Sequence, residues 1–183
     1  MKLNIDNCCL LIIDLQEKLL PHIFNKEKIK INSNRLLDLF DDLNLPIIYT
    51  EQYPKGLGPT VKCLRQKLID NKSKKIEKTT FSAFDNEELK TYMTQINKKQ
   101  IIIIGVESHI CVLQTTIDLL ENDKQVYVVE ECVGSRKLEN ADMGINRMLK
   151  NGASLINFEM IFFELIRDSK NQFFKKLSSK FVK

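Results

Sequence analysis

The chain has 183 residues, of which 43% are hydrophobic and 28% are charged. This composition is typical of a globular protein and differs from that of disordered, fibrous or membrane proteins. The longest apolar runs, at 10–13 and 101–104, are much shorter than the roughly 20 residues that span a bilayer. We therefore expect one domain over 1–183, with no membrane contact and no signal peptide.

The charges and cysteines favour a cytoplasmic protein that binds no nucleic acid. The formal net charge is +4, but the lysines are spread along the chain without the interleaved aromatic residues of a nucleic-acid surface. The five cysteines are odd in number, and none has the close paired spacing of a zinc site or a redox motif. Unpaired thiols of this kind fit a reducing compartment.

Short β-rich segments alternate with segments of helical spacing along the whole chain. The apolar runs of the expected strands indicate a parallel sheet that is buried on both faces, with helical crossovers. The sequence therefore predicts a Rossmann-like, three-layer α/β/α domain with a parallel sheet of about six strands. The expected strands lie at 8–14, 46–50, 75–79, 100–106, 125–132 and 153–158, and helical spacing occurs at 36–43, 89–96, 110–120, 145–149 and 174–181.

Polar residues end several of the expected strands. Asp14 follows the first, Glu51 and Gln52 follow the second, and Lys78 ends the third. The segment 107–111, with Cys111, follows the fourth. Ligands of open α/β sheets bind beyond the carboxyl ends of the strands, where the strand order reverses. If the first and fourth strands are neighbours, Asp14 and Cys111 face each other and Lys78 reaches in from the side.

Each of these residues alone has a simpler interpretation. Asp14 alone is more often a turn or cap residue, Lys78 a solvated strand end, and Cys111 is as readily an inert buried thiol as a nucleophile. Together they supply a base, a charge that stabilises a thiolate, and a nucleophile. At a helix start, the dipole lowers the pKa of a thiol, and free N–H groups can hold an oxyanion.

Three segments resemble the isochorismatase-like cysteine hydrolases, a family that includes nicotinamidases and N-carbamoylsarcosine amidases. They are LLIIDLQEKLLP, EKTTFSAF and GVESHICVLQTTIDLL, and they occur in the family's order. Two more, YTEQYPKGLGPT and FEMIFFELIRDS, are similar to the subgroup of isochorismatase domain-containing proteins. The resemblance therefore covers nearly the whole chain.

The resemblance implies a role for each matching residue. Asp14 corresponds to the general base, Lys78 to the lysine of the catalytic triad, and Cys111 to a nucleophile that forms a thioester-type intermediate. It also implies a cis peptide bond between Val106 and Glu107, and an oxyanion hole made by the backbone N–H groups of Glu107 and Cys111.

Cofactors are not expected. No G-x-G-x-x-G or Walker A loop follows the first strand. Nicotinamidases carry an Asp-His-His metal cluster after the second strand, where this chain reads EQYPKG at 51–56, and its only histidines are His22 and His109. We therefore expect no metal and no nicotinamidase activity.

The sequence thus predicts a metal-independent, amidase-like cysteine hydrolase. Enzymes that hydrolyse the vinyl ether of isochorismate use an acid and need no thiol, so Cys111 favours cleavage of a C–N bond in a small molecule. A homo-oligomer is expected, and the predicted pocket residues are Leu19, Tyr53, Phe81 and His109. Two alternatives stay open on the same fold, a non-catalytic oligomeric interaction protein and a thiol redox sensor.

Overall fold

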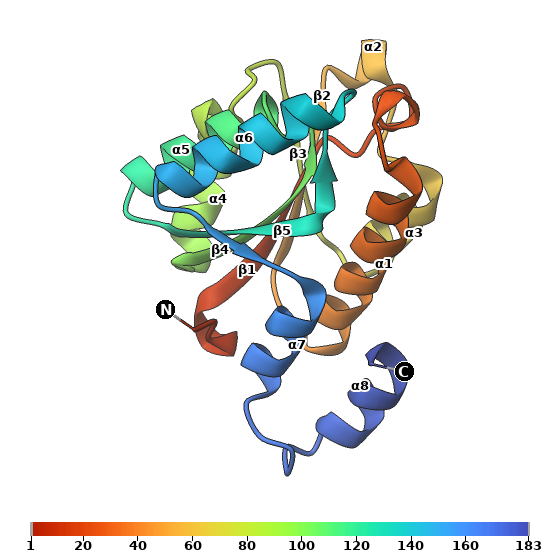
Figure 1. Cartoon of the computed structure of the whole chain (residues 1–183), viewed down its shortest axis with the longest axis vertical. Helices are drawn as coiled ribbons and strands as arrows, with labels where there is room; N and C mark the ends of the chain where they lie inside the picture. The colour runs from red at the N-terminus through yellow and green to blue at the C-terminus, as the bar shows by residue number, and fades with distance from the viewer. Residues whose placement is uncertain (1, 183) are drawn as a thin grey trace.

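A computed structural model describes residues 2–182, and its centre is a six-stranded, all-parallel sheet (Figure 1). The strand order is β3-β2-β1-β4-β5-β6, so the order reverses between β1 and β4. The predicted fold class and sheet are therefore confirmed. The strands are β1 (Cys8–Ile13), β2 (Ile47–Gln52), β3 (Lys74–Lys78), β4 (Gln100–Val106), β5 (Gln125–Gly134) and β6 (Ser154–Ile156).

The two central strands, β1 and β4, are buried along their whole length. Successive side chains of a strand point to opposite faces, so CCLLII and QIIIIGV supply apolar groups to both layers. Leu10 and Ile12 belong to one hydrophobic core, and Leu11 and Ile13 belong to the other. The unbroken apolar runs of the sequence therefore mark the middle of the sheet.

Helices cover both faces of the sheet. One layer contains α4 (Glu87–Ile96), α5 (Cys111–Glu121) and α6 (Leu138–Lys150), and the other contains α1 (Lys26–Asp42), α3 (Lys62–Asp70), α7 (Phe158–Ile166) and α8 (Phe174–Phe181) (Figure 1). The short helix α2 (Pro54–Leu57) follows β2. Short 3-10 turns lie at Ile5–Asn7, Leu20–His22 and Ala83–Asp85. Within residues 2–182, no helix combines the length and the apolar character that a membrane crossing requires.

Every strand except β4 differs from its predicted bounds by one or two residues at one end or both, and two of these differences have a clear local cause. The last strand ends at Ile156 rather than at 158, because the Asn157 side chain caps α7 by accepting from the N–H of Met160. The first strand ends at Ile13, and Asp14 leaves it with a φ of 49°. This left-handed conformation turns the chain at the carboxyl edge of the sheet.

Gly105 allows the ends of β1 and β4 to approach each other. It pairs with Ile13 and has a φ of 127°. A Cβ atom there would overlap the carbonyl oxygen of Ile13, so only glycine fits. The segments that follow these strands carry Asp14 and Cys111, and the close approach brings them to one edge.

Candidate active site

Asp14 lies buried at the carboxyl edge of the sheet, where both of its carboxylate oxygens are engaged. Oδ1 accepts a 2.6 Å hydrogen bond from the Thr50 hydroxyl, and Oδ2 lies 2.7 Å from Nζ of Lys78. The Asp14 N–H donates to the same Thr50 oxygen at 3.2 Å. Thr50 therefore fixes both the backbone and the carboxylate of Asp14.

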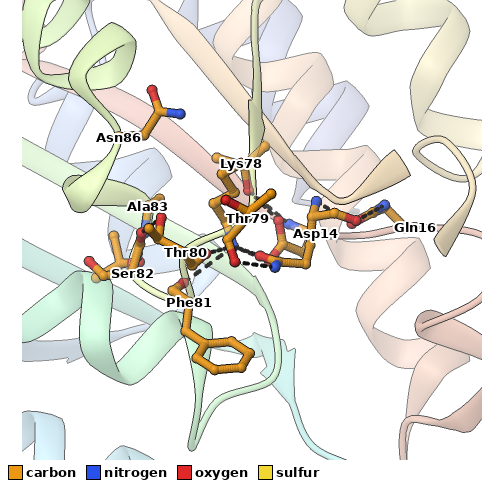
Figure 2. A network of polar contacts seen from close by, with 12 residues as sticks. Asp14, Gln16, Lys78, Thr79, Thr80, Phe81, Ser82, Ala83 and Asn86 are labelled. Carbon is orange, nitrogen blue, oxygen red and sulfur yellow. Dashed lines mark hydrogen bonds and ion pairs between the residues drawn. The ribbon is translucent and has the colours of Figure 1, made fainter. Parts of the chain in front are cut away.

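Lys78 ends β3, and its ammonium group is surrounded by acceptors (Figure 2). Besides the Asp14 carboxylate, it donates to Oε1 of Gln52 at 2.6 Å and to the carbonyls of Thr80 and Phe81 at 3.2 Å each. Its side chain is fully buried. A buried ammonium needs such partners, so the predicted strand-end lysine is a fixed charge beside Asp14 rather than a solvated one.

Cys111 is the first residue of α5 and is 8% exposed. Its buried thiol lies close enough to Asp14 and Lys78 for both charges to act on it, so the structure brings the three predicted residues together. Burial, assisted by the charge of Asp14, raises the pKa of the Cys111 thiol to about 12 despite the opposing charge of Lys78. The expectation of a stabilised thiolate is therefore wrong for the resting site, where the thiol keeps its proton.

The turn between β4 and α5 leads into the helix that begins with Cys111. The peptide bond between Val106 and Glu107 is cis. The Glu107 carbonyl accepts from the N–H groups of Ile110 and Val112, at 3.0 and 3.2 Å. The Glu107 carboxylate points to Arg136, whose Nε lies at 3.0 Å. The first turn of a helix has backbone N–H groups without intrahelical acceptors, and here it carries Cys111.

Side chains of α5 hold the loop that follows Lys78. The Ser82 hydroxyl donates to the Asp118 carboxylate, and the N–H of Ala83 donates to the Thr115 hydroxyl at 2.9 Å. The helix that carries Cys111 is thus tied to the loop whose carbonyls hold the lysine. Sequence reasoning missed this link, because neither the loop nor the helix carries a motif for it.

Gln16 and Gln52 are two further site residues that received no role from the sequence. Besides accepting from Lys78, Gln52 donates from its side-chain amide to the Thr79 carbonyl at 2.8 Å. The Gln16 amide donates to the carbonyls of Gln52 and Gly58, at 2.9 and 2.7 Å, and accepts from the Gln52 N–H at 2.7 Å. The available signal was position, since both residues lie at or just beyond a strand end.

The four predicted pocket residues differ in how directly they are connected to Lys78. The backbones of Tyr53 and Phe81 touch Lys78, since the Tyr53 N–H donates to its carbonyl at 2.9 Å, and both side chains are over half exposed. Nδ1 of His109 lies 2.8 Å from the Ser135 hydroxyl. Leu19 packs against the core beneath α1. Their role in substrate binding stays a prediction.

Glu51 lies in the segment that corresponds to the metal cluster of nicotinamidases. Its carboxylate is engaged in other contacts in this protein. Its carboxylate accepts from the N–H and hydroxyl of Thr60, at 2.7 and 2.9 Å, and lies 2.9 Å from Nζ of Lys75. Burial acts to raise the pKa of Glu51, but these hydrogen bonds and the lysine outweigh it and hold the pKa below its usual range. Across residues 2–182, no three His, Cys, Asp or Glu side chains are grouped to hold a metal ion.

We expect Glu51→Gln to destabilise the protein by about 1–3 kcal/mol at neutral pH, because charge-assisted hydrogen bonds of this kind contribute that much. The contribution is fully present above the ordinary pKa of a glutamate and is lost as the pH falls through the lowered pKa of Glu51. Urea unfolding of both proteins between about pH 3 and about pH 7 measures the difference in their free energies of unfolding. A difference that grows in acid would contradict this assignment.

Comparison with known proteins agrees with the fold. The family model described as Isochorismatase domain matches residues 8–160. Isochorismatase family protein 1A of Dictyostelium discoideum is 39% identical over 171 residues, which cover 92% of this chain and 82% of that protein. A structure titled MAR1 ribonuclease from Caenorhabditis elegans has a TM-score of 0.93 and 35% identity, covering 100% of this chain and 93% of the other.

Two structures of YcaC are also similar, each with a TM-score of 0.91 and 29% identity. The Escherichia coli protein, described as an octameric hydrolase of unknown specificity, matches 100% of this chain over 91% of its own. The Pseudomonas aeruginosa structure contains covalent acrylamide and matches 99% of this chain over 92% of its own. The parallel sheet with helices on both faces is therefore a hydrolase fold of the isochorismatase type. The chain belongs to the isochorismatase family.

Proposed function

We propose that the protein is a metal-independent cysteine hydrolase that cleaves a C–N bond in a small amide-like molecule, with 1–183 as one catalytic domain. The observation that carries this proposal is the burial of Cys111 beside the Asp14–Lys78 ion pair, close enough for both charges to act on its thiol. A thiol, a carboxylate and a fixed positive charge are the groups that covalent acyl transfer requires.

The reaction begins with a proton transfer, because the resting thiol is protonated. Asp14 takes the proton from Sγ of Cys111 as the sulfur bonds to the substrate carbonyl carbon, and the carbonyl electron pair moves to its oxygen. The backbone N–H groups of Glu107 and Cys111 hold this oxyanion. The Lys78 ammonium lies 2.7 Å from the Asp14 carboxylate and holds it in place.

The second half of the reaction releases the amine and restores the enzyme. The oxyanion collapses, the C–N bond breaks, and Asp14 passes its proton to the leaving nitrogen. Asp14 then takes a proton from water, which attacks the thioester carbonyl. The C–S bond breaks, the acid product leaves, and the proton returns to Sγ of Cys111. One base therefore serves both steps.

A small substrate fits this site better than a nucleic acid. Asp14, Lys78 and Cys111 are all buried, so only a group that enters between the loops can reach the sulfur. The ammonium of Lys78 is committed to four protein acceptors, so it is not free to bind a phosphate. The ribonuclease title of a relative makes RNA cleavage a useful comparison in the experiment.

Two features of relatives support the proposal. Covalent acrylamide in a YcaC structure is evidence that a protein of this fold has a nucleophile that reacts with a small electrophile. The octameric YcaC supports self-association, and we propose that this protein also forms a homo-oligomer.

The test is turnover of a panel of small amides, ureido compounds, isochorismate and a short RNA by wild type and Cys111→Ala. We expect wild type to hydrolyse at least one amide or ureido compound and Cys111→Ala to hydrolyse none. Hydrolysis that survives in Cys111→Ala would overturn the covalent mechanism. Oxidation of Cys111 without turnover would favour the redox sensor, and an inert Cys111 would favour the interaction protein.

A further inference from the structure

Helix α7 exposes two apolar side chains beside two glutamates on its outer face. Its sequence is FEMIFFELI, and the side chains that face the core are Phe158, Ile161, Phe162, Leu165 and Ile166. Met160 and Phe163 point outward and are 44% and 48% exposed. Phe163 packs in part against Phe174 of α8, but both apolar side chains keep nearly half of their surface exposed. Exposed apolar side chains that lie together on a surface are typical of an interaction site.

The two exposed side chains border a surface hollow of about 440 Å³. The N-terminal segment forms part of its rim and is anchored to α7, because the Leu3 N–H donates to the Glu164 carboxylate at 2.7 Å and Arg167 donates to the Leu3 carbonyl. The Lys2 carbonyl accepts from the side chain of Gln100 at 3.0 Å. The hollow is therefore a built surface rather than a gap beside a loose end.

The rim of the hollow carries charges of both signs. Lys2 and Glu159 are exposed on it, and Glu164 and Arg167 add one further charge of each sign. In a two-fold contact the same surface meets itself, so a group on one copy faces a different group on the other. A surface with an apolar centre and both signs at its rim is complementary to itself.

We propose that the outer face of α7, formed by Met160 and Phe163 with Lys2 and Glu159 at its rim, is an interface with a second copy of this chain. This inference rests on the self-association proposed above and assigns it a surface. Lys2 of one copy pairs with Glu159 of the other, twice across the two-fold axis, while Met160 and Phe163 form the apolar centre.

The outer face of α7 lies away from the candidate active site. In Figure 1, α7 lies at the end of the molecule away from α2, which follows the carboxyl end of β2. The candidate active site lies at that carboxyl edge. Substitutions on α7 therefore leave the catalytic groups in place, and assembly can be measured without activity.

The experiment is analytical ultracentrifugation of the full chain at micromolar concentration. We expect wild type to be oligomeric, and Met160→Glu and Phe163→Glu each to reduce the assembly to about half its mass or less, since a two-fold contact joins two equal parts. Thermal unfolding confirms that each variant is folded. If the Phe163 variant does not fold, because Phe163 also packs against Phe162 and Phe174, Met160→Glu carries the test.

Charge reversal provides the matched control. Lys2→Glu and Glu159→Lys should each weaken the assembly because like charges then face each other, and the double variant Lys2→Glu/Glu159→Lys should restore it. A monomeric wild type would overturn both the proposed self-association and this interface. An oligomeric wild type whose mass none of the substitutions changes would overturn the interface alone.

Discussion

Replacement of Asp14 by asparagine is expected to lower turnover by roughly 10²–10⁴-fold and to destabilise the fold by about 3–5 kcal/mol. Turnover falls because the amide cannot accept the thiol proton. Stability falls because the fully buried ammonium of Lys78 loses its counter-ion at 2.7 Å, while its other acceptors are neutral oxygens of Gln52, Thr80 and Phe81.

The measurements are urea unfolding at about pH 7 and turnover of the substrate that the panel identifies. The control is Asp14→Asn/Lys78→Met, which removes both charges of the pair. We expect it to recover most of the stability and none of the activity, because two neutral groups of similar size leave no buried charge. A single variant as stable as wild type would show that Lys78 does not depend on Asp14.

The fold could be predicted from the sequence because burial of a parallel strand leaves a continuous apolar run. The runs around Leu10 and Ile102 identify the two central strands, whose adjacency places the switch point. The same reasoning brought Asp14, Lys78 and Cys111 to one edge, since parallel strands end together. Strand ends were less certain, because a cap such as Asn157 acts through a single side-chain contact.

The contacts that hold the site could not be predicted in the same way. Thr50 and Asp14 are 36 positions apart, and so are Ser82 and Asp118. Such pairs depend on the rotation of single side chains, which no periodic pattern records. The Cys111 pKa was predicted in the wrong direction for a related reason, since position revealed the nearby charges but not the depth of burial that outweighs them.

The reactivity of Cys111 toward iodoacetamide provides the last expected result. The stabilised thiolate expected from the sequence would make Cys111 the cysteine that is alkylated fastest near neutral pH, but the structure leads to another order. Cys63 is exposed, whereas Cys111 is buried and its pKa is raised to about 12. We therefore expect wild type to be alkylated first at Cys63, and at Cys111 only slowly, with a rate that rises up to about tenfold per pH unit while the thiolate is the minor form.

Substitutions of the two charged neighbours should move this rate in opposite directions. Asp14→Asn removes a negative charge that raises the pKa of the Cys111 thiol, so alkylation should become faster even as turnover is lost. Lys78→Met removes the charge that lowers this pKa, so alkylation should become slower. Site-resolved mass spectrometry at about pH 8 and about pH 9 measures both rates, with Cys63 as the reference within the same molecule. If Asp14→Asn slows Cys111 together with Lys78→Met while Cys63 is unchanged, Asp14 already holds the thiol proton in the resting enzyme, and the order of proton transfer proposed here is wrong.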